Sequence, residues 1–424
     1  MLNDFFMGWL GRTTLIAADN TWGLLGVMVI GVALSIWLEQ KYKWASKVSG
    51  AIIALILAMV LANFNIIPIS CVLYDDIVWG VIVPMGIPLL LLQCNLKKIW
   101  SETGRMLVIF LIGAVGTIVG AFLAFFVLKA PYSATGGQVT DLAAVASMMT
   151  GSYIGGDVNF AAMAAQHGLQ GTDIAAAATV ADNLLMALYF FVLIAFAGMR
   201  LFRKNFKHPH IDEIESGNVD KAAAETQAAA FWSRKDISLK DIAFNIAYCV
   251  GIVWISNIVA GIFASIAPDS TNAFIDFVHK FFGSQYVWIT TFSVIVATCM
   301  DKKVAEMHGS QEIGTYLIYL FLFVIGVPAN IYTVVTKSPL LLALTAIMVL
   351  INMLFCFIAA KLFKFNLEDA IIASNANIGG PTTAAGMAIS QGWVKLVGPA
   401  MLVGVLGYVV GNYAGTIVGI VLGA

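Results

Sequence analysis

The sequence predicts an all-α integral membrane protein built from two inverted repeats. Its 424 residues are 60% hydrophobic and only 11% charged, and the mean hydropathy is +0.90, which is too apolar for a soluble globular domain. Apolar runs of roughly 20 residues, the length that crosses about 30 Å of hydrocarbon, recur along the whole chain. Two nearly identical motifs, at Gly155-Gly156 and at Gly379-Gly380, interrupt otherwise apolar stretches. Paired breaks of this kind are typical of duplicated transporters.

About ten segments are long and apolar enough to be transmembrane helices. They are expected near residues 20–38, 48–67, 74–95, 104–128 and 172–200 in the first half, and near 238–266, 285–300, 312–335, 338–362 and 393–423 in the second. Two further segments, 141–168 and 366–392, contain the Gly-Gly motifs and are rich in Ala, Ser, Thr and Asn. We expect both to be broken helices. The chain then divides into a first repeat (1–200), a polar linker (201–237) and a second repeat (238–424).

The distribution of Lys and Arg predicts that both broken segments turn back as re-entrant hairpins. If they do, the cytoplasmic loops and the central linker hold 19 Lys and Arg residues, and the external loops hold 4. If both segments cross the membrane, the counts become 9 and 14, which contradicts the positive-inside rule. The re-entrant topology places the N-terminus outside and the linker in the cytoplasm, and it inverts the second half relative to the first.

Two internal matches support the duplication. Seven of the 15 positions from Ile154 to Gly168 are identical in the segment from Ile378 to Gly392, against about one expected for such a Gly- and Ala-rich composition. The third span of each half also carries a Gly-x-Pro motif, Gly86-Ile87-Pro88 and Gly326-Val327-Pro328. Both motifs are expected to kink their helices.

Hairpins of two half-helices place helix ends inside the membrane, where free N–H groups attract anions and free carbonyl groups attract cations. Glycines at the break would let a ligand approach the main chain closely. Alternatively, such small residues only allow close helix packing. The expected substrate-binding residues are Gly155, Gly156, Asn159, Asn377, Gly379, Gly380, Thr382 and Thr383.

Asp157 lies in the first break, and an ionisable side chain within a membrane is costly unless it serves a pathway or a binding site. It would ligate Na⁺ or carry a proton, or else cap the return half-helix. Asp182 and Asn183, about ten residues into the following span, are placed to face the hairpin. They would supply hard oxygens suited to Na⁺, or else interhelical hydrogen bonds. Together with Asn412 in the last span, these are the expected coupling-ion residues, with Asp157 and Asp182 as the Na⁺ ligands.

The remaining patterns exclude several other classes of protein. The formal net charge is −1, and no long basic tract indicates a nucleic-acid partner. The five cysteines are scattered singly, without a CxxC or Cys/His cluster, and no removable signal peptide is expected. No HExxH, Ser/His/Asp or nucleotide-loop motif indicates an enzyme or an ATP-driven pump, so no cofactor is expected. The linker is expected to be solvated and to contain a short surface helix, rather than a regulatory or metal-binding element.

The motifs IGGDVNF (154–160) and NIGGPTTAAGMA (377–388) give nearly the whole chain a resemblance to the YjcL-like family of multispanning membrane proteins, a domain of unknown function. More remotely, the chain is similar to the cation:proton antiporter/anion transporter superfamily, which includes sodium–glutamate and sodium–citrate symporters. That similarity implies Gly-rich hairpins in inverted repeats, a homodimeric scaffold and elevator movement of a transport domain. Asp157 and Pro381 stand where the glutamate symporters carry a His, and substrate identity does not transfer with a fold. The elements carried over by position are Gly155-Gly156, Asp157, Asn159, Gly379-Gly380, Thr382 and Thr383.

These observations predict a secondary active transporter in the cell membrane, with the lipid bilayer and a small molecule as its partners. It would move an organic anion or zwitterion, such as a carboxylate, an amino acid or a short peptide, coupled to Na⁺ or H⁺. The nearest alternative is a cation/proton antiporter that uses Asp182-Asn183 and has no organic substrate. A remote alternative is an intramembrane aspartyl protease, because Tyr74-Asp75 and Gly155-Gly156-Asp157 partly match its two-aspartate motifs. Those enzymes need Gly-x-Gly-Asp, however, and Ile154 stands at the first position.

Overall fold

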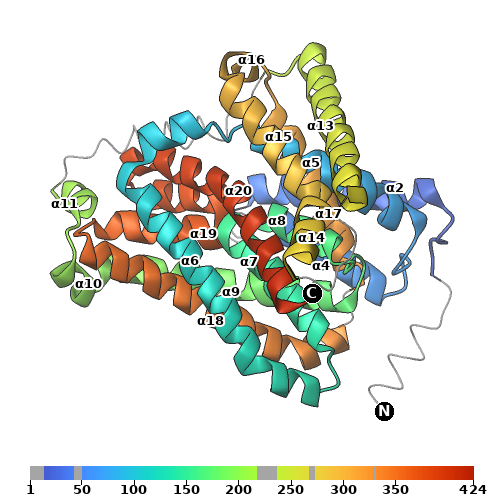
Figure 1. Ribbon diagram of the computed structural model, residues 1–424, viewed down its shortest axis with the longest axis horizontal. Helices are drawn as coiled ribbons and strands as arrows, with labels where there is room; N and C mark the ends of the chain where they lie inside the picture. The colour runs from blue at the N-terminus through green and yellow to red at the C-terminus, as the bar shows by residue number, and fades with distance from the viewer. Residues whose placement is uncertain (1–13, 43–49, 217–235, 267–272, 329–330) are drawn as a thin grey trace.

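The computed structural model describes residues 14–42, 50–216, 236–266, 273–328 and 331–424, and every regular element in these ranges is a helix (Figure 1). Seven of the described helices are long and apolar enough to cross a membrane, and three shorter apolar helices lie at the other expected spans. The prediction of a multispanning all-α membrane protein is therefore confirmed. The expected external N-terminus and residues 217–235 of the linker lie outside the described residues.

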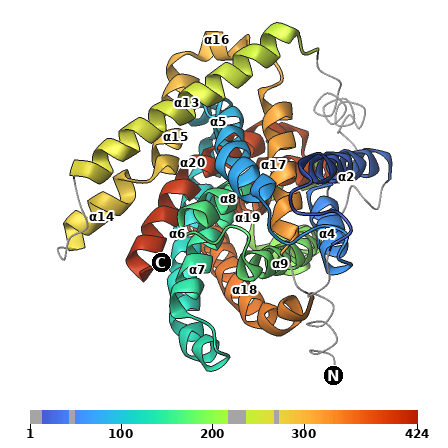
Figure 2. The same cartoon turned by 90° about the vertical axis from the view of Figure 1, so that its right-hand side faces the viewer.

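The helices form two groups, each of which makes most of its contacts within itself (Figures 1 and 2). The core group consists of α6 (Leu96–Ala134), α7 (Val139–Gly155), α8 (Asp157–Gln166), α9 (Asp173–Gly198), α18 (Ile331–Leu362), α19 (Leu367–Ser390) and α20 (Val397–Leu422). The outer group consists of α2 (Thr21–Lys41), α4 (Gly50–Asn63), the π-helix η1 (Leu73–Ile82), α5 (Val83–Leu91), α13 (Leu239–Ile266), α14 (Ala273–Phe282), α15 (Gln285–Cys299) and α17 (Ser310–Gly326). Each group draws helices from both halves of the sequence.

Helix boundaries differ from expectation in the second half. The span expected at 312–335 ends at Gly326, and the apolar residues from Ile331 onward belong to α18, because hydropathy alone does not show where one apolar helix ends and the next begins. Pro88 lies inside α5, whereas Pro328 follows the end of α17. The second Gly-x-Pro motif therefore ends its helix rather than kinking it, because Pro328 has no N–H group to donate to the preceding turn. Helix α14 lies in a stretch where no helix was expected.

The chain breaks at both Gly-Gly motifs with the same backbone geometry. Gly156 has φ 80° and ψ −173°, and Gly380 has φ 76° and ψ −170°, a combination that is essentially restricted to Gly. The two glycines are 224 positions apart, and so are the last residues of α8 and α19. The helices that follow, α9 and α20, are both 26 residues long and begin at the same separation.

At the first break the chain turns back on itself. Asn159 Nδ2 in α8 donates a hydrogen bond to Gly151 O in α7 at 3.3 Å, although residues eight apart in a straight helix are separated by about 12 Å. Farther from the break, Ser147 Oγ and His167 Nε2 are 2.8 Å apart. The two half-helices are therefore antiparallel, and we call this unit, α7 with α8, hairpin 1.

The second break has the same architecture within α19. Asn375 Nδ2 donates to Thr383 O at 3.2 Å and to Met387 Sδ at 3.4 Å, so the chain again returns beside itself. We call α19 hairpin 2. Both hairpins lie within two residues of the boundaries expected from the sequence.

A row of glycines on α20 lets hairpin 1 approach the helix backbone. These glycines recur every fourth residue along one face: Gly407, Gly411, Gly415 and Gly419. A Cβ on Gly407 would collide with Ile154 O, and a Cβ on Gly411 would lie 2.7 Å from Gly151 O. Small residues give membrane helices this close contact because dispersion forces then act between the two backbones.

Replacing Gly407 with Ala is expected to destabilise the protein, because the added methyl group would force α20 away from α7. The matched control is Gly398→Ala on the same helix, where no atom lies within 4 Å of the added Cβ. There the higher helix propensity of Ala, worth about 1 kcal/mol, should leave stability unchanged or slightly raised. Thermal unfolding of the detergent-solubilised protein measures both effects. Equal Tm values for the two variants would contradict the close approach.

Candidate functional site

The two Gly-Gly breaks meet inside the core group. A Cβ built on Gly156 would lie 3.7 Å from Gly380 Cα, and a Cβ built on Gly380 would lie at the same distance from Gly156 Cα. Both glycines are buried. The tips of two hairpins from opposite halves of the chain thus touch through their backbones, without a side chain between them.

The four motif glycines serve two different purposes. Gly156 and Gly380 adopt backbone angles that other residues avoid. Gly155 instead allows close packing, since a Cβ there would collide with Gly407 O, and a Cβ on Gly379 would collide with Thr383 Oγ1. Close helix packing, one of the two interpretations of the motif, therefore applies to Gly155 and Gly379, whereas Gly156 and Gly380 are required by the backbone conformation of the breaks. The close approach of a ligand to these glycines stays a prediction.

Carbonyl groups near the first break are bonded by polar side chains. Asn159 Nδ2 donates to Gly151 O at 3.3 Å and to Gly407 O at 3.2 Å. Thr117 Oγ1, from α6, donates to Tyr153 O at 3.1 Å. The amide group of Asn159, expected to bind substrate, thus joins hairpin 1 to α20, and only its Oδ1 atom is left to meet a ligand.

The second hairpin uses its polar residues in the same way. Asn377 Nδ2 donates to Phe110 O in α6 at 3.1 Å and to Ala373 O at 3.2 Å. Its Oδ1 atom is buried and has no hydrogen-bond partner among the described residues. Thr383 Oγ1 donates to Gly380 O at 3.0 Å. The expected ligands Asn377 and Thr383 therefore also hold the hairpin together.

Two carboxylates stand beside the breaks. Asp157 is the first residue of α8, and it interacts electrostatically with Asp182 of α9, which is 3% exposed. Ser152 Oγ donates to Asp182 Oδ2 at 3.3 Å, and the Tyr153 hydroxyl also lies close enough to stabilise the Asp182 carboxylate. Asp182 Oδ1 itself is buried and makes no hydrogen bond of ordinary geometry within the part of the chain that the structure describes. Two neighbouring carboxylates in an apolar surrounding repel each other, and a bound cation or a proton would relieve that repulsion.

The two amides expected to assist this pair differ in their surroundings. Asn183 is half-buried, and its Nδ2 donates to Thr179 O at 2.9 Å, one turn earlier in α9. Asn412 is fully buried, and neither side-chain atom has a hydrogen-bond partner within the described ranges. Of the two amides, Asn412 therefore has the greater free capacity to bind an ion or a water molecule.

Sequence reasoning missed three tyrosines. Tyr153, Tyr319 and Tyr408 each interact electrostatically with Asp157. Tyr319 belongs to α17 of the outer group, and its hydroxyl donates to Glu39 Oε2 at 3.1 Å. The sequence contained one signal for a role of Tyr153, which directly precedes the Ile154-Gly155-Gly156 motif. The hydroxyl group of a tyrosine inside an apolar span needs a polar partner, so this position indicated a polar site nearby.

The residues around the meeting point of the two tips, where Gly156 contacts Gly380, differ in how exposed they are. Thr382 is exposed, and Asp157 and Thr383 are half-buried, although Pro381 and the touching glycines are buried. The Thr382 hydroxyl has no partner within the described residues. Side chains beside the backbone contact are therefore accessible at Thr382 and partly accessible at Asp157 and Thr383, while the contact itself is closed.

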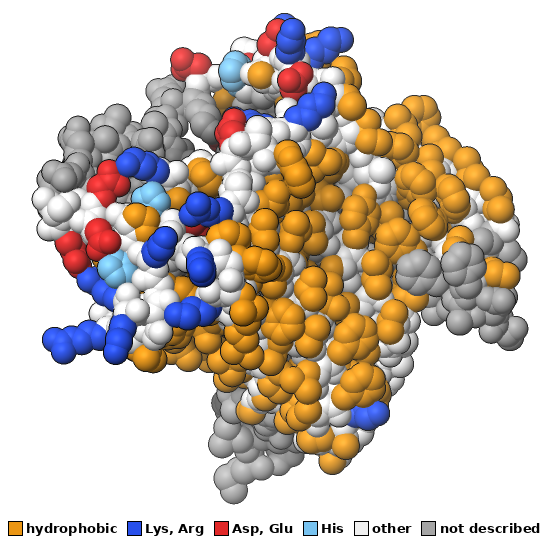
Figure 3. Space-filling view, turned by 60° about the vertical axis from the view of Figure 1, so that its left-hand side comes forward, with side chains coloured by type: hydrophobic (Ala, Val, Ile, Leu, Met, Phe, Trp, Pro, Cys, Tyr) orange, Lys and Arg blue, Asp and Glu red, His pale blue; other side chains and the backbone are white. Residues whose placement is uncertain are grey.

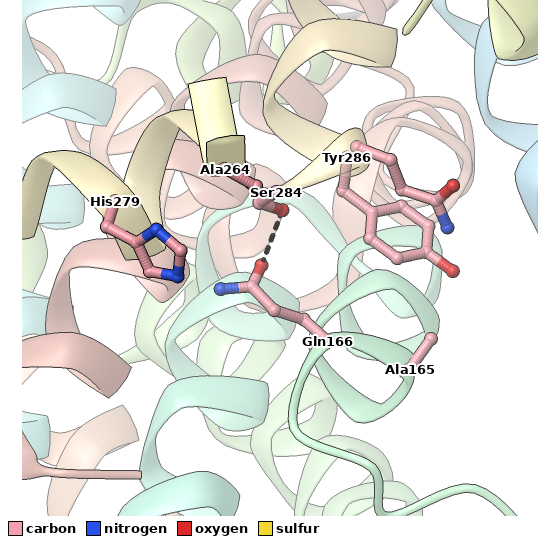
Figure 4. Close-up of a pocket in the computed structure, with 8 residues that line it drawn as sticks. Ala165, Gln166, Ala264, His279, Ser284 and Tyr286 are labelled. Carbon is pink, nitrogen blue, oxygen red and sulfur yellow. Dashed lines mark hydrogen bonds between the residues drawn. The ribbon is translucent and has the colours of Figure 1, made fainter. Parts of the chain in front are cut away.

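A cavity lies away from the breaks, where hairpin 1 meets the outer group (Figure 4). Its volume is about 470 Å³, and its lining includes Gln166, His279, Ser284 and Tyr286. Gln166 Oε1 accepts hydrogen bonds from Ser284 Oγ at 3.1 Å and from Thr416 Oγ1 at 3.2 Å. Asp157 begins α8 and Gln166 ends it, so about 15 Å of helix separates the carboxylate from this cavity.

The first part of the linker is docked onto hairpin 2. It forms α10 (Arg200–Asn205) and α11 (Pro209–Glu215), and we call residues 200–216 the docked segment. Glu368 Oε1, at the start of hairpin 2, accepts hydrogen bonds from the backbone N–H groups of His210 and Ile211 at 2.8 and 2.9 Å. The expected surface helix is present as α11, but it is not solvated on all sides, because Ile211 and Glu368 are buried in the contact.

Both ends of hairpin 2 take part in this docking. Beyond the hairpin, Lys395 Nζ is 2.7 Å from Glu213 Oε1, and a Cβ on Gly392 would lie 3.2 Å from Ile214 Cδ1. The hydrogen bond from the Lys395 ammonium lowers the pKa of the Glu213 carboxyl group. The ion pair between Lys395 and Glu213 therefore stabilises the docked segment at pH values above the ordinary pKa of Glu. This stabilisation is lost as the pH falls through the lowered pKa of Glu213.

Comparison with known proteins places the whole site within one matched region. The profile of a family described as "Protein of unknown function (DUF819)" matches residues 26–424. The chain is also 44% identical over 408 residues to the "Uncharacterized membrane protein YjcL" of Bacillus subtilis (strain 168), covering 96% of this chain and 98% of the relative. Both hairpins, the carboxylate pair and the docked segment lie inside the residues that the family profile matches.

Cysteine labelling is expected to distinguish the two sides of the hairpin 2 tip. In a Cys299→Ser background, which removes the one exposed native cysteine found among the described residues, Thr382→Cys should react with a membrane-impermeant methanethiosulfonate. Ala384→Cys, two residues later and fully buried, should react about tenfold more slowly or not at all. Mass spectrometry of the labelled protein gives both rates. Similar rates at the two positions would contradict an accessible tip.

Reversing one charge in the docked segment is expected to loosen it. Lys395→Glu would place a carboxylate against Glu213, and hydrogen exchange of residues 207–215 should become about two- to fivefold faster, because a surface ion pair contributes little to stability. The double variant Glu213→Lys with Lys395→Glu should restore slow exchange. If the double variant exchanges as fast as the single one, the ion pair does not hold the segment.

Proposed function

The chain belongs to the DUF819 family, and we propose that it is a secondary active transporter that moves a small organic anion or zwitterion coupled to Na⁺ or H⁺. One observation carries this proposal. The broken backbones of two hairpins touch at Gly156 and Gly380 beside two neighbouring carboxylates, the half-buried Asp157 and the buried Asp182. Such an arrangement is costly to build into an apolar core, and it offers binding groups for an anion and a cation at the same place.

The polarity of the half-helices supports binding of an organic anion. Helix α8 begins at Asp157, and the return half of hairpin 2 begins at Pro381, so both helix N-termini lie at the meeting point. Helix N-termini carry unpaired N–H groups and a partial positive charge that favour carboxylates. The exposed hydroxyl group of Thr382 would add a neutral donor for the same ligand.

The carboxylate pair supports coupling to a cation. Asp182 Oδ1 is buried without a hydrogen-bond partner among the described residues, and Asp157 is close enough to interact with it. Carboxylate and hydroxyl oxygens are hard ligands that suit Na⁺, and a shared proton would also reduce the repulsion. No cluster of three His, Cys, Asp or Glu residues that could hold a metal ion occurs in the described ranges, which favours a monovalent ion over a transition metal.

Two features support inverted repeats and elevator movement. The breaks share one backbone geometry at a constant spacing of 224 residues, and the two tips face each other, as expected for re-entrant hairpins that enter from opposite faces. Both hairpins also belong to the core group, so this group could carry the whole site as it slides along the outer group. We propose that the outer group forms the scaffold of a homodimer.

A cation/proton antiporter is the second candidate. The unpaired Asp182 Oδ1 atom favours it, because a carboxylate pair could exchange Na⁺ for protons without an organic substrate.

The aspartyl protease alternative is less well supported. Asp75 is exposed and lies against Gly171, beyond the end of α8, whereas Asp157 begins that helix. The two aspartates are therefore not placed to share a catalytic water molecule.

The proposal is tested by uptake into proteoliposomes. An imposed inward Na⁺ or proton gradient should drive accumulation of at least one of radiolabelled citrate, glutamate or a dipeptide. Asp157→Asn and Asp182→Asn should each lower the initial rate by roughly tenfold or more, the equivalent of about 1.4 kcal/mol of ion binding. The matched control is Asp75→Asn, at an exposed carboxylate outside the site, which should transport like the wild type.

The same vesicles separate the two candidates. Proton release from vesicles on addition of NaCl alone, followed with an internal pH-sensitive dye, would favour the antiporter. If the wild-type protein drives gradient-dependent uptake and both Asp→Asn variants retain its rate, the roles assigned to the carboxylates are wrong.

A further inference from the structure

We propose that α10 and the end of α18 form a binding surface for the headgroup of an anionic phospholipid. Four cationic side chains make up this surface, which we call the basic collar: Arg200, Lys204, Lys207 and Lys364. The collar is separate from the hairpin tips, and the proposal holds whether or not the protein is a transporter.

No acidic side chain among the described residues neutralises the positive charge of the collar. Each acidic side chain of the neighbouring helix α11 already has a basic partner: Asp212 with His208 at 2.8 Å, Glu213 with Lys395 at 2.7 Å, and Glu215 with Arg203 at 2.6 Å. In contrast, none of the four collar side chains has an acidic partner within the described residues. The collar therefore keeps four net positive charges for an external anion.

Backbone contacts bring the four cations together. Lys361 Nζ, in the last turn of α18, donates to Asn205 O at 2.6 Å, and Leu367 N donates to Lys207 O at 2.8 Å. These bonds fasten the end of α10 to the end of α18 and pair Lys207 with Asn366, two residues after Lys364. Arg200 and Lys204 are four residues apart on α10, so they lie on the same face of that helix.

Exposed apolar side chains alternate with these cations. Leu201 is 68% exposed, Leu362 is 72% exposed and Phe363 is 56% exposed. Figure 3 shows Lys and Arg side chains gathered at one side of the molecule, directly beside a wide hydrophobic surface. A basic and apolar mixture at such a border is typical of segments that lie in the membrane interface and attract anionic lipids.

The apolar side chains favour a phospholipid over a soluble phosphate compound. A ligand that satisfies only the cations would leave Leu201, Leu362 and Phe363 exposed to water, whereas a phospholipid offers a phosphate to the cations and acyl chains to the apolar residues. The collar also continues into α11, whose backbone is held by Glu368. A bound headgroup would therefore restrain the docked segment and, with it, the base of hairpin 2.

Native mass spectrometry of the full-length protein tests the proposal. Phosphatidylglycerol and phosphatidylcholine with identical acyl chains are added to the detergent-solubilised protein, and inorganic phosphate is added in a separate arm. The wild type should retain phosphatidylglycerol about tenfold more strongly than phosphatidylcholine and should retain no phosphate. Raised ionic strength should weaken this preference, because exposed charges are screened by salt.

Two matched variants decide the outcome. The collar variant carries Arg200→Gln, Lys204→Gln, Lys207→Gln and Lys364→Gln, and it should lose the preference for phosphatidylglycerol. The control variant removes the same number of exposed cations elsewhere, through Lys97→Gln, Lys98→Gln, Lys302→Gln and Lys303→Gln, and it should keep the preference. If the collar variant does not fold, Lys204→Gln with Lys364→Gln is used and should lose most of the preference. Equal preference in the collar and control variants would overturn the proposal.

Discussion

The central constraint on this molecule is that backbone groups freed at two helix breaks must find partners inside an apolar core. Thr117 of α6 meets this requirement at hairpin 1 by donating to Tyr153 O next to the break, and Asn159 ties the hairpin to α20 by donating to Gly407 O. Asn377 joins hairpin 2 to α6 in a similar way. The two halves of the chain are therefore interlocked at the hairpins, because each break is completed by a helix from the other half. The antiparallel hairpins, the glycine face of α20 and the core group all follow from this requirement.

Much of the architecture could be predicted from local sequence. Apolar run length located the spans, and the Gly-Gly motifs in Ala-, Ser- and Asn-rich segments located both hairpins within two residues. Contacts between the halves could not be predicted in this way. The pairing of Gly407 with Ile154 depends on how two distant helices cross, and the role of Tyr319 depends on a helix from the outer group that reaches Asp157. The docking of α11 was also missed, because Glu368 reads as an ordinary acidic residue in a first helical turn until its two backbone donors are known.

The two hairpins have the same backbone geometry at their breaks, but their side chains differ in chemistry. Hairpin 1 carries Asp157 and packs near Asp182, so it brings negative charge to the meeting point. Hairpin 2 presents Pro381 and two threonines there, and its base is fastened to the docked segment at Glu368 and Lys395. Under the proposed function, ion binding and mechanical restraint would therefore fall to different hairpins. This division would let a change in one hairpin alter coupling without disturbing the attachment of the other.

The contact between Gly156 and Gly380 also limits how the two Gly-Gly motifs can differ in sequence. A side chain at either position would need both an unfavourable backbone conformation and space that the other glycine occupies. No second substitution can compensate, because glycine is already the smallest residue. The next position is free of this restriction, and there the copies differ as Asp157 and Pro381. Drift after a gene duplication would therefore leave the glycine pair frozen and concentrate new chemistry one residue away.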